Sequence, residues 1–555
     1  MANNMIDEKQ YVIPTGVNVL DYLHSKEIFI TAPCGGHGTC GKCKILLLAG
    51  TLPPGESDLA LLSEDEVNAG IRLACKAKSG TPVRISVPAG PGGRAAGLEE
   101  DFFQTSSDYD RETGLRTEGV DPAHKYGIAV DIGTTTLAAA FADMTLGKVL
   151  ITRTSVNRQR IFGADVVSRT EAALSGKGED LKRIIERDLC GLIESLGIPD
   201  GINVSKMVIA GNTTMYHLLM EYDVRGISEY PFKPVSLGGE WFLRDEVFSL
   251  ETVRRKVLPE NCRIYLIPGL STFVGGDIFS GLSALGITED EGNVFFIDIG
   301  TNAEMVIKKG DKYYMASAAA GPALEGGNLK WGTGSVAGAI CGVEILGDEE
   351  KITTTISNAS PVGICGTGAL EAVYELLRAG IINEYGTFTE EYLQTGFPLA
   401  KSATGEIIGL DQDDIRQIQM AKAAIRAGAE ALLEHAGITP GELDRVYVSG
   451  GFGSFLDMKK AASIGLLPEG MAEKVRAVGN TSLKGAEMVL FEKVNLSLKK
   501  QRVFDGRETL HYKEKRERVD SIESDYEKVR ENAEPVDLAN DEGFKEKYIE
   551  FMNFW

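Results

Sequence analysis

The chain has no long hydrophobic run: nowhere do 18 or more apolar residues follow one another, so no transmembrane helix is expected. Its first ten residues, MANNMIDEKQ, include acids but no apolar stretch, which argues against a secretory signal peptide. Basic residues are also outnumbered, since 58 lysines and arginines face 80 acids and leave a net charge of −22. Nucleic acid is therefore not expected as a partner, because phosphate binding needs concentrated positive charge. We expect a cytoplasmic protein that makes no membrane contact.

Cysteine is rare as well, with eight residues in 555, too few for a disulfide framework. A P-loop of the form G-x-x-x-x-G-K-[ST] is absent, which excludes one common class of nucleotide-binding fold. What is present is an ordinary globular composition, with 43% hydrophobic and 25% charged residues. At this length the chain exceeds one hydrophobic core, so we expect three or four folding units.

Composition shifts divide the sequence into four parts. Residues 1–98 hold half of the cysteines and end in a Pro/Gly run, and residues 99–125 read as an acidic linker. Residues 126–505 alternate apolar strand-like runs with helical stretches, which indicates α/β architecture. Residues 506–555 are charged and read as a helical tail that docks on the preceding domain, with partner binding as the alternative. Its aromatic residues near helical spacing are Phe544, Tyr548, Phe551 and Trp555.

The α/β region contains a short internal repeat. The segment YGIAVDIGTTTLAAAF (126–141) resembles VFFIDIGTNAEMV (294–306). In each, an apolar run leads to Asp-Ile-Gly-Thr and then to a second strand-like run. A strand, a tight turn and a returning strand that occur twice indicate two related half-domains, at about 126–290 and 291–505.

The cysteines near the N-terminus follow the pattern of a metal site. Cys34, Cys40 and Cys43 are separated by five and two residues, and Cys75 follows after a further 31. Three thiolates on one loop and a fourth from a distant element suit a [2Fe–2S] cluster. The glycines of PCGGHGTCGKC let the backbone fold tightly around such a cluster and direct amides at its sulfurs.

Structural zinc is the alternative, but zinc loops normally pair C-x2-C with a second C-x2-C or a histidine pair. The flanks of the cysteine loop favour the cluster: YVIPTG, VNVLDYLHSK and TPVRISV read as strand, helix and late strand. Together they resemble the β-grasp ferredoxin domain over about residues 8–90. This resemblance implies one-electron transfer.

Asp131 and Asp298 stand at the ends of the two repeated apolar runs. A carboxylate at a strand end can hold Mg²⁺ through water, since Mg²⁺ keeps much of its hydration shell. The residues after each aspartate offer a flexible turn with hydroxyl, amide and backbone donors for phosphate. We predict phosphate loops built from Gly133, Thr134, Thr135 and Thr136 and from Gly300, Thr301 and Asn302.

A third glycine-rich turn, RVYVSGGFGSFLD (445–457), follows another apolar run. Small residues at Gly450, Gly451 and Gly453 let a nucleotide's adenosine and α-phosphate lie against the backbone; tight packing alone is the other interpretation. The three motifs resemble the phosphate-1, phosphate-2 and adenosine motifs of the acetate and sugar kinase, Hsp70 and actin (ASKHA) superfamily. The resemblance covers about residues 126–500 and implies two RNase-H-like halves that close on ATP and Mg²⁺ in a central cleft.

Further turns rich in glycine and polar residues are expected to line the same cleft. They are AGNTTMYHLL (210–219), IPGLSTFVGGD (267–277), AAGPALEGG (319–327) and ICGTGALEAV (364–373). Asp277 and Glu304 are candidates to orient the water that attacks the γ-phosphate, although each could equally be an exposed or structural carboxylate. Phosphoryl transfer depends mainly on positioning and charge neutralisation, so no unusual nucleophile is required.

The other four cysteines have no metal-ligand spacing and are interpreted as buried unreactive thiols. They are Cys190, Cys262, Cys341 and Cys365. Some activators of this superfamily hold a [4Fe–4S] cluster at a dimer interface, and the resemblance leaves a homodimer open.

An electron-transfer module and an ATP-binding module on one chain resemble the reductive activators of corrinoid proteins, and this resemblance covers nearly the whole chain. It implies ATP-dependent transfer of one electron from a low-potential donor through [2Fe–2S] to Co(II), which regenerates Co(I). The chain has no D-x-H-x-x-G cobalamin signature, so the corrinoid is expected on a partner protein of a methyl-transfer system. Two alternatives stay open: a small-molecule kinase with a fused redox-sensing ferredoxin domain, and a redox-gated ATP-binding protein without catalysis.

Overall fold

The structure is a computed structural model, and it describes residues 10–26, 28, 30, 32, 34–87, 120–249, 258–346, 351–450, 457–491, 500–504, 510–514 and 522–554. The chain divides into two compact units. The first comprises residues 1–102 and 157–185, and the second comprises residues 103–156 and 186–555. Within the described ranges, no helix combines the length and the apolar character needed to cross a membrane.

The first unit contains a four-stranded antiparallel sheet in the order β1-β4-β2-β3. Its strands are β1 (Gln10–Ile13), β2 (Lys44–Ala49), β3 (Ile71–Leu73) and β4 (Val83–Ser86). The helices beside it are α1 (Val19–Ser25), α2 (Glu56–Leu61) and α3 (Glu64–Asn68). Asn18 begins α1, because its side chain accepts a hydrogen bond from the Asp21 amide. The strand, helix and late strand expected from the sequence are thus present as β1, α1 and β4.

Residues 157–185 of the first unit are mainly helical. They form η2 (Arg158–Ile161), α4 (Val166–Ala172), the π-helical segment η3 (Ala173–Lys177) and the start of α5 (Gly178–Ser195). Asp165 begins α4, since its carboxylate accepts the amide hydrogen of Ser168 at 2.8 Å.

The second unit is built on two six-stranded sheets. The first sheet has the order β7-β6-β5-β8-β10-β9. Its strands are β5 (Tyr126–Ile132), β6 (Thr136–Asp143), β7 (Lys148–Val156), β8 (Val204–Gly211), β9 (Trp241–Leu243) and β10 (Arg263–Leu266). Short helices in the connections are α6 (Thr213–Met220), α7 (Arg225–Ser228) and α8 (Arg244–Val247). The central strand β5 pairs antiparallel with β6 and parallel with β8, so its apolar run is buried on both faces.

The second sheet has the order β20-β19-β11-β12-β13-β23. Its strands are β11 (Val294–Ile299), β12 (Ala303–Lys309), β13 (Lys312–Ala318), β19 (Arg445–Gly450), β20 (Val475–Gly479) and β23 (Ala533–Pro535). The strand β11 pairs antiparallel with β12 and parallel with β19, which repeats the pairing of β5 with β6 and β8. The duplicated fold predicted from the internal repeat is therefore confirmed.

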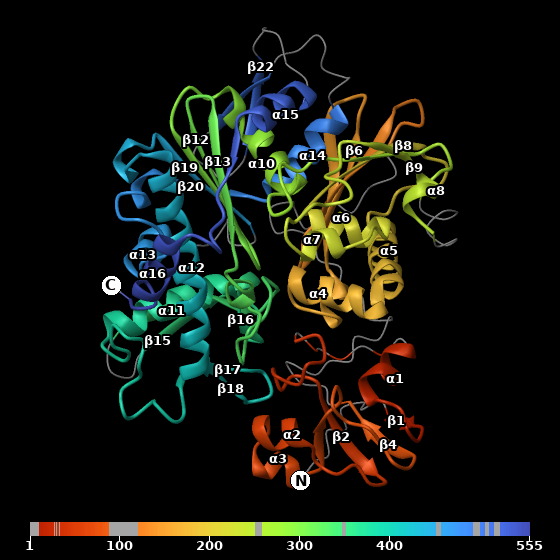
Figure 1. Ribbon diagram of the computed structural model, residues 1–555, viewed down its shortest axis with the longest axis vertical. Helices are drawn as coiled ribbons and strands as arrows, with labels where there is room; N and C mark the ends of the chain where they lie inside the picture. The colour runs from red at the N-terminus through yellow and green to blue at the C-terminus, as the bar shows by residue number, and fades with distance from the viewer. Residues whose placement is uncertain are drawn as a thin grey trace. The chain divides into compact units, whose positions relative to one another are not determined.

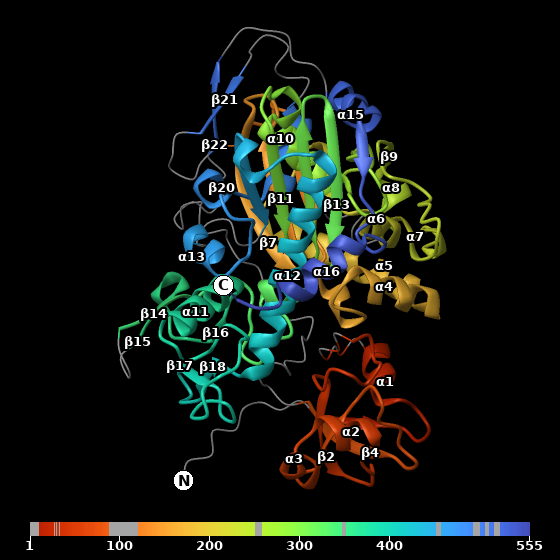
Figure 2. The ribbon, with the colours of Figure 1, turned by 60° about the vertical axis from the view of Figure 1, so that its left-hand side comes forward.

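Two helices lie between the sheets, α10 (Gly276–Leu285) and α14 (Thr481–Phe491), as Figures 1 and 2 show. They approach closely at Gly485, where an added Cβ would lie 2.2 Å from the Ser280 hydroxyl. Apolar side chains of both sheets pack against this helix pair in one shared core. The two halves therefore meet through this layer of two helices, which ends beside the strands that carry Asp131 and Asp298.

The second half carries additional elements around its longest helix, α12 (Gln412–Ala436). They are α11 (Gly366–Arg378), α13 (Met458–Ser463), β14 (Ala339–Ile345), β15 (Lys351–Thr355), β16 (Gly363–Ile364), β17 (Phe397–Lys401) and β18 (Ile407–Leu410). Asp411 begins α12 by accepting the amides of Asp413 and Asp414, and Gly437 ends it in the left-handed conformation. One core joins this region to the second sheet.

The C-terminal part of the chain contains strands as well as helices. They are β21 (Lys500–Phe504), β22 (Leu510–Glu514), α15 (Ile522–Glu531), β23 and α16 (Glu542–Glu550). Figure 2 shows α16 beside α12, where Lys422 donates from Nζ to the Asn553 carbonyl at 2.5 Å and Phe554 is 2% exposed. The segment 506–555 was predicted as a helical tail; within it, residues 510–514 and 533–535 are strands.

Candidate functional site

The four N-terminal cysteines lie close together in the first unit. Cys34, Cys40 and Cys43 lie on the loop between α1 and β2, and Cys75 follows β3. The thiols of Cys34 and Cys40 contact each other, and so do those of Cys43 and Cys75. The Asn18 side-chain amide donates to the Cys75 carbonyl at 2.8 Å, which fixes the distant ligand relative to α1. The structure thus brings together all four predicted ligands as two pairs.

The cysteine loop depends on its glycines. Gly35, Gly36, Gly38 and Gly41 all have positive φ, between 61° and 90°. At Gly38 an added Cβ would also lie 2.7 Å from the Ser57 hydroxyl. A side chain at Gly38 would therefore strain the backbone and displace its neighbours, which would open the loop.

Two pairs of thiols fit a binuclear cluster, in which four cysteines share two irons. Within the described parts of the chain, no three His, Cys, Asp or Glu side chains converge as ligands for a single ion. The pairing of the thiols agrees with a binuclear [2Fe–2S] cluster. The contact between the Cys34 and Cys40 thiols lowers the pKa of Cys34 to about 3 and raises the pKa of Cys40, because one thiol donates its hydrogen to the other.

Four carboxylates meet in the second unit. Asp131 lies near the end of β5, Asp298 lies on β11 directly opposite Glu304 of β12, and Asp277 lies in the first turn of α10. Burial, together with the neighbouring carboxylates Asp298 and Asp131, raises the pKa of Asp277 to about 7. Burial also raises the pKa of Asp298 to about 7, the pKa of Asp131, and that of Glu304 well above its usual value. So many acids in one place favour a bound cation.

The two strand-end aspartates are held by donors that the sequence analysis did not identify. Asp131 accepts hydrogen bonds from Asn480 at 2.8 Å and from Ser482 at 2.7 Å. Asp298 accepts one from the Ser449 hydroxyl at 2.8 Å. Asn480 and Ser482 stand where β20 leads into α14, so the second half of the domain orients a carboxylate of the first.

The two predicted phosphate loops are closed turns. The Gly133 amide donates to the Thr136 carbonyl at 3.1 Å, and the Gly300 amide donates to the Asn302 carbonyl at 2.8 Å. An added Cβ at Gly133 would lie 2.6 Å from the same Thr136 carbonyl, so the turn needs glycine. Each turn joins the antiparallel strands that the repeat predicted.

Threonine hydroxyls from the two loops meet. Thr135 and Thr301 lie 3.2 Å apart, and both contact the carboxylate of Glu325. Thr134 accepts a hydrogen bond from the Asn212 side chain at 3.1 Å. Asn212 and Glu325 belong to the segments 210–219 and 319–327 that the sequence predicted to line the cleft, but neither residue was singled out.

The third predicted motif ends β19 at Gly450; Gly451 and Gly453 lie outside the described residues. Gly450 has φ of 108°, and an added Cβ would lie 2.2 Å from the Ile299 carbonyl. The two strands that carry Asp298 and Gly450 therefore touch backbone to backbone at this position.

We expect Gly450→Ala to weaken nucleotide binding by at least about tenfold, because the new methyl group strains the turn and moves it away from Asp298. Titration of the full chain with Mg²⁺–ADP measures the change. Gly178→Ala is the matched control, since Gly178 has φ of −58° and open space at its Cβ position. Equal affinity in both variants would remove Gly450 from the nucleotide site.

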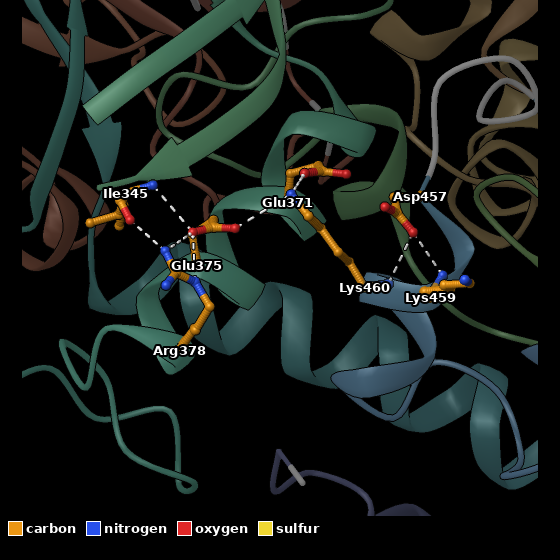
Figure 3. A network of polar contacts seen from close by, with 7 residues as sticks. All are labelled: Ile345, Glu371, Glu375, Arg378, Asp457, Lys459 and Lys460. Carbon is orange, nitrogen blue, oxygen red and sulfur yellow. Dashed lines mark hydrogen bonds and ion pairs between the residues drawn. The ribbon is translucent and has the colours of Figure 1, made fainter. Parts of the chain in front are cut away.

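A network of ion pairs ties α13, which follows the third motif, to α11 (Figure 3). Lys460 pairs with Glu371 and lies 3.4 Å from Glu375, which also pairs with Arg378 at 2.7 Å. Asp457 begins α13 by accepting the amides of Lys459 and Lys460. Glu371, Glu375, Arg378 and Lys460 of this network line a pocket of about 880 Å³ that includes none of the predicted site residues. The charges of the network are paired with one another, so we interpret the network as a structural link between α11 and α13.

Three family models match the chain. The model of a 2Fe-2S iron-sulfur cluster binding domain matches residues 4–79. The RACo middle region matches residues 126–290, and the model described as the C-terminal domain of RACo, the ASKHA domain, matches residues 292–517. The predicted ferredoxin and ASKHA-type folds are thereby confirmed.

Similar proteins agree with these models. The corrinoid activation enzyme RamQ of Eubacterium limosum is 35% identical over 397 residues, which cover 66% of this chain and 64% of RamQ. The [Co(II) methylated amine-specific corrinoid protein] reductase of Methanosarcina barkeri is 28% identical over 395 residues, covering 67% of this chain and 71% of the reductase. The match thus spans just under two thirds of the length of RamQ.

A solved structure extends the agreement to the whole chain. It is described as a reductive activator for corrinoid, iron-sulfur protein, and it superposes with a TM-score of 0.68 at 27% sequence identity, covering 99% of this chain and 97% of its own. A ferredoxin-type domain, a RACo middle region and a RACo-type ASKHA domain follow one another in the same chain. The chain therefore belongs to the family of reductive activators of corrinoid proteins.

Proposed function

We propose that this protein is an ATP-dependent iron–sulfur reductive activase. It passes one electron from a low-potential donor through its [2Fe–2S] cluster to the Co(II) of a partner corrinoid protein, which regenerates Co(I). The observation that carries the proposal is the presence, in one chain, of two thiol pairs suited to a binuclear cluster and of four neighbouring carboxylates beside the two predicted phosphate loops. The names of the relatives support the same activity.

In the proposed reaction, ATP supplies the free energy that reduction of Co(II) requires. Co(II) of a corrinoid is reduced only at very low potential, and for one electron every ~59 mV uphill costs a factor of ten in the equilibrium constant. Nucleotide binding or hydrolysis can favour the partner state that is easier to reduce. Such coupling between binding sites is reciprocal, so the corrinoid partner should change the affinity for nucleotide.

The residues of the cleft have distinct proposed roles. Asp131 and Asp298, which lie close enough for Asp131 to raise the pKa of Asp298, hold Mg²⁺ through water. The turns at Gly133 and Gly300 supply backbone and hydroxyl donors to the phosphates. Asp277 and Glu304 lie beside the two aspartates and orient the attacking water.

Anaerobic visible spectroscopy tests the proposal. The full chain is mixed with ATP, Mg²⁺, a chemical reductant and a corrinoid protein in the Co(II) state; a methylamine-type corrinoid protein and a corrinoid iron–sulfur protein are tried separately. We expect Co(I) absorption only when protein, reductant and ATP are all present. ATP turnover that responds to a small-molecule acceptor and to neither corrinoid protein would indicate a kinase instead.

A further inference from the structure

Glu325 lies at an unusual place for an acid, between the two phosphate loops. It ends the short helix η5 (Pro322–Glu325), which lies between β13 and β14 and closes at Gly326 with φ of 78°. Its half-buried carboxylate accepts a hydrogen bond from Thr135 at 3.1 Å and another from Thr301. One carboxylate thus binds the hydroxyls of both loops.

The same carboxylate occupies space beside a phosphate-loop glycine. One of its oxygens lies 3.7 Å from the position that a Cβ would take on Gly300, the residue predicted to let phosphate approach the backbone. After burial and Asp131, the charge of Glu325 also contributes to the raised pKa of Asp298. The negative charge of Glu325 therefore sits within the region that would receive the phosphates.

The hydroxyls of Thr135 and Thr301 have one hydrogen each to donate. A hydroxyl that donates to Glu325 cannot donate to a phosphate oxygen at the same time. An arriving phosphate is also repelled by the carboxylate, since both are anions at short range. Phosphate and Glu325 therefore compete for the same donors.

We propose that Glu325 is an internal stand-in for a nucleotide phosphate: it joins the two loops in the nucleotide-free protein and is displaced when ATP binds. This inference rests on the proposed ATP site. Displacement breaks the contact between Thr135 of the first half and the 319–327 segment of the second. The nucleotide thereby replaces one link between the halves with another and moves the segment that carries Glu325. Glu325 acts as a positioning residue that lowers nucleotide affinity and reports nucleotide binding to the second half.

Calorimetric titration of the full chain with Mg²⁺–ADP and Mg²⁺–AMPPNP tests the competition. We expect Glu325→Ala to bind one or both nucleotides about tenfold more tightly, because one like charge is removed beside the phosphates. Glu325→Gln keeps the size and the acceptor oxygen but loses the charge, so it should fall between wild type and Ala. Adenosine, which has no phosphate, should bind all three proteins equally. Glu390→Ala removes an exposed carboxylate and should leave affinity unchanged.

Other roles for Glu325 give different results. A catalytic base would leave nucleotide affinity unchanged in Glu325→Ala and lower kcat alone, and an Mg²⁺ ligand would weaken binding only when Mg²⁺ is present; either result overturns the inference. Melting temperatures within a few degrees of wild type confirm that the variants fold. A wild-type chain that binds nucleotide but does not respond to Glu325 substitution overturns this inference alone. Absence of any nucleotide binding in wild type overturns the proposed function with it.

Discussion

Cys75→Ser should leave the chain without its [2Fe–2S] cluster while nucleotide binding persists. Cys75 forms one of the two thiol pairs with Cys43, so its loss leaves one iron with a single cysteine ligand. The described core around these cysteines is made of residues 13–87 alone, separate from the cores of the ATP domain. Anaerobic iron and sulfide analysis should find about two of each per wild-type chain and almost none in the variant.

The control for this experiment is Cys190→Ser. Cys190 is a buried thiol on α5 whose Sγ contacts the Glu194 carboxylate, so its replacement should not change iron content or visible absorption. Reduction of the corrinoid should stop in Cys75→Ser and continue in Cys190→Ser. Wild-type protein that holds zinc and shows no visible charge-transfer absorption would end the electron-transfer assignment.

Asp298→Asn should lower nucleotide turnover by about 100-fold or more, the usual loss when a charge-stabilising group of an active site is removed. The same variant should be more stable than wild type. The fold raises the pKa of Asp298 from 3.8 to about 7. As the pH rises through this window, Asp298 ionises in the unfolded chain at a lower pH than in the folded chain, so the folded state loses stability. Ionised Asp298 therefore destabilises the fold at higher pH, and neutral asparagine removes this penalty while it can still accept the Ser449 hydrogen bond.

Two measurements at pH 8 separate these effects: ATP hydrolysis with Mg²⁺, and thermal melting without nucleotide or Mg²⁺. We expect lost turnover, a raised melting temperature and an intact cluster spectrum. Asp311→Asn, at a side chain that is 82% exposed, should change none of these. A lowered melting temperature in Asp298→Asn would attribute the lost turnover to damaged folding, and turnover equal to wild type would remove Asp298 from the phosphate site.

The strand-end aspartates could be predicted because each lies within a short motif that occurs twice. Asp131 and Asp298 follow apolar runs in matching contexts, and the structure places them in matching positions of two sheets. The grouping of the four cysteines could be predicted for a different reason, because three of them share one loop. Local sequence was sufficient wherever a strand, a turn and the chemical groups belong to one segment.

The groups that hold these residues could not be predicted, because they come from distant parts of the chain. Ser482 and Asp131 are 351 positions apart, and Glu325 and Thr135 are 190 apart. Nothing near Ser482 distinguishes it from an ordinary helix start. Their roles depend on how the halves pack, which a single sequence does not state.

The strand β23 was missed for a further reason. It has three residues, and Pro535 weakens any strand signal. An edge position tolerates this proline, since only one side of β23 pairs, with β13. Short edge strands take their conformation from the sheet that receives them.

The pairing of β13 with β23 also determines how late in synthesis the second sheet can be completed. Lys312 and Glu534, which pair across these strands, are 222 positions apart. A ribosome adding about 5–20 residues per second needs roughly 10 to 45 s to cover that interval. Throughout it, the outer edge of β13 offers unpaired backbone groups, and α12, once it has been synthesised, lacks the cover of α16 and Phe554. The ATP domain therefore passes through a period in which an exposed sheet edge can recruit other nascent chains, and the period closes only when residues 533–554 arrive.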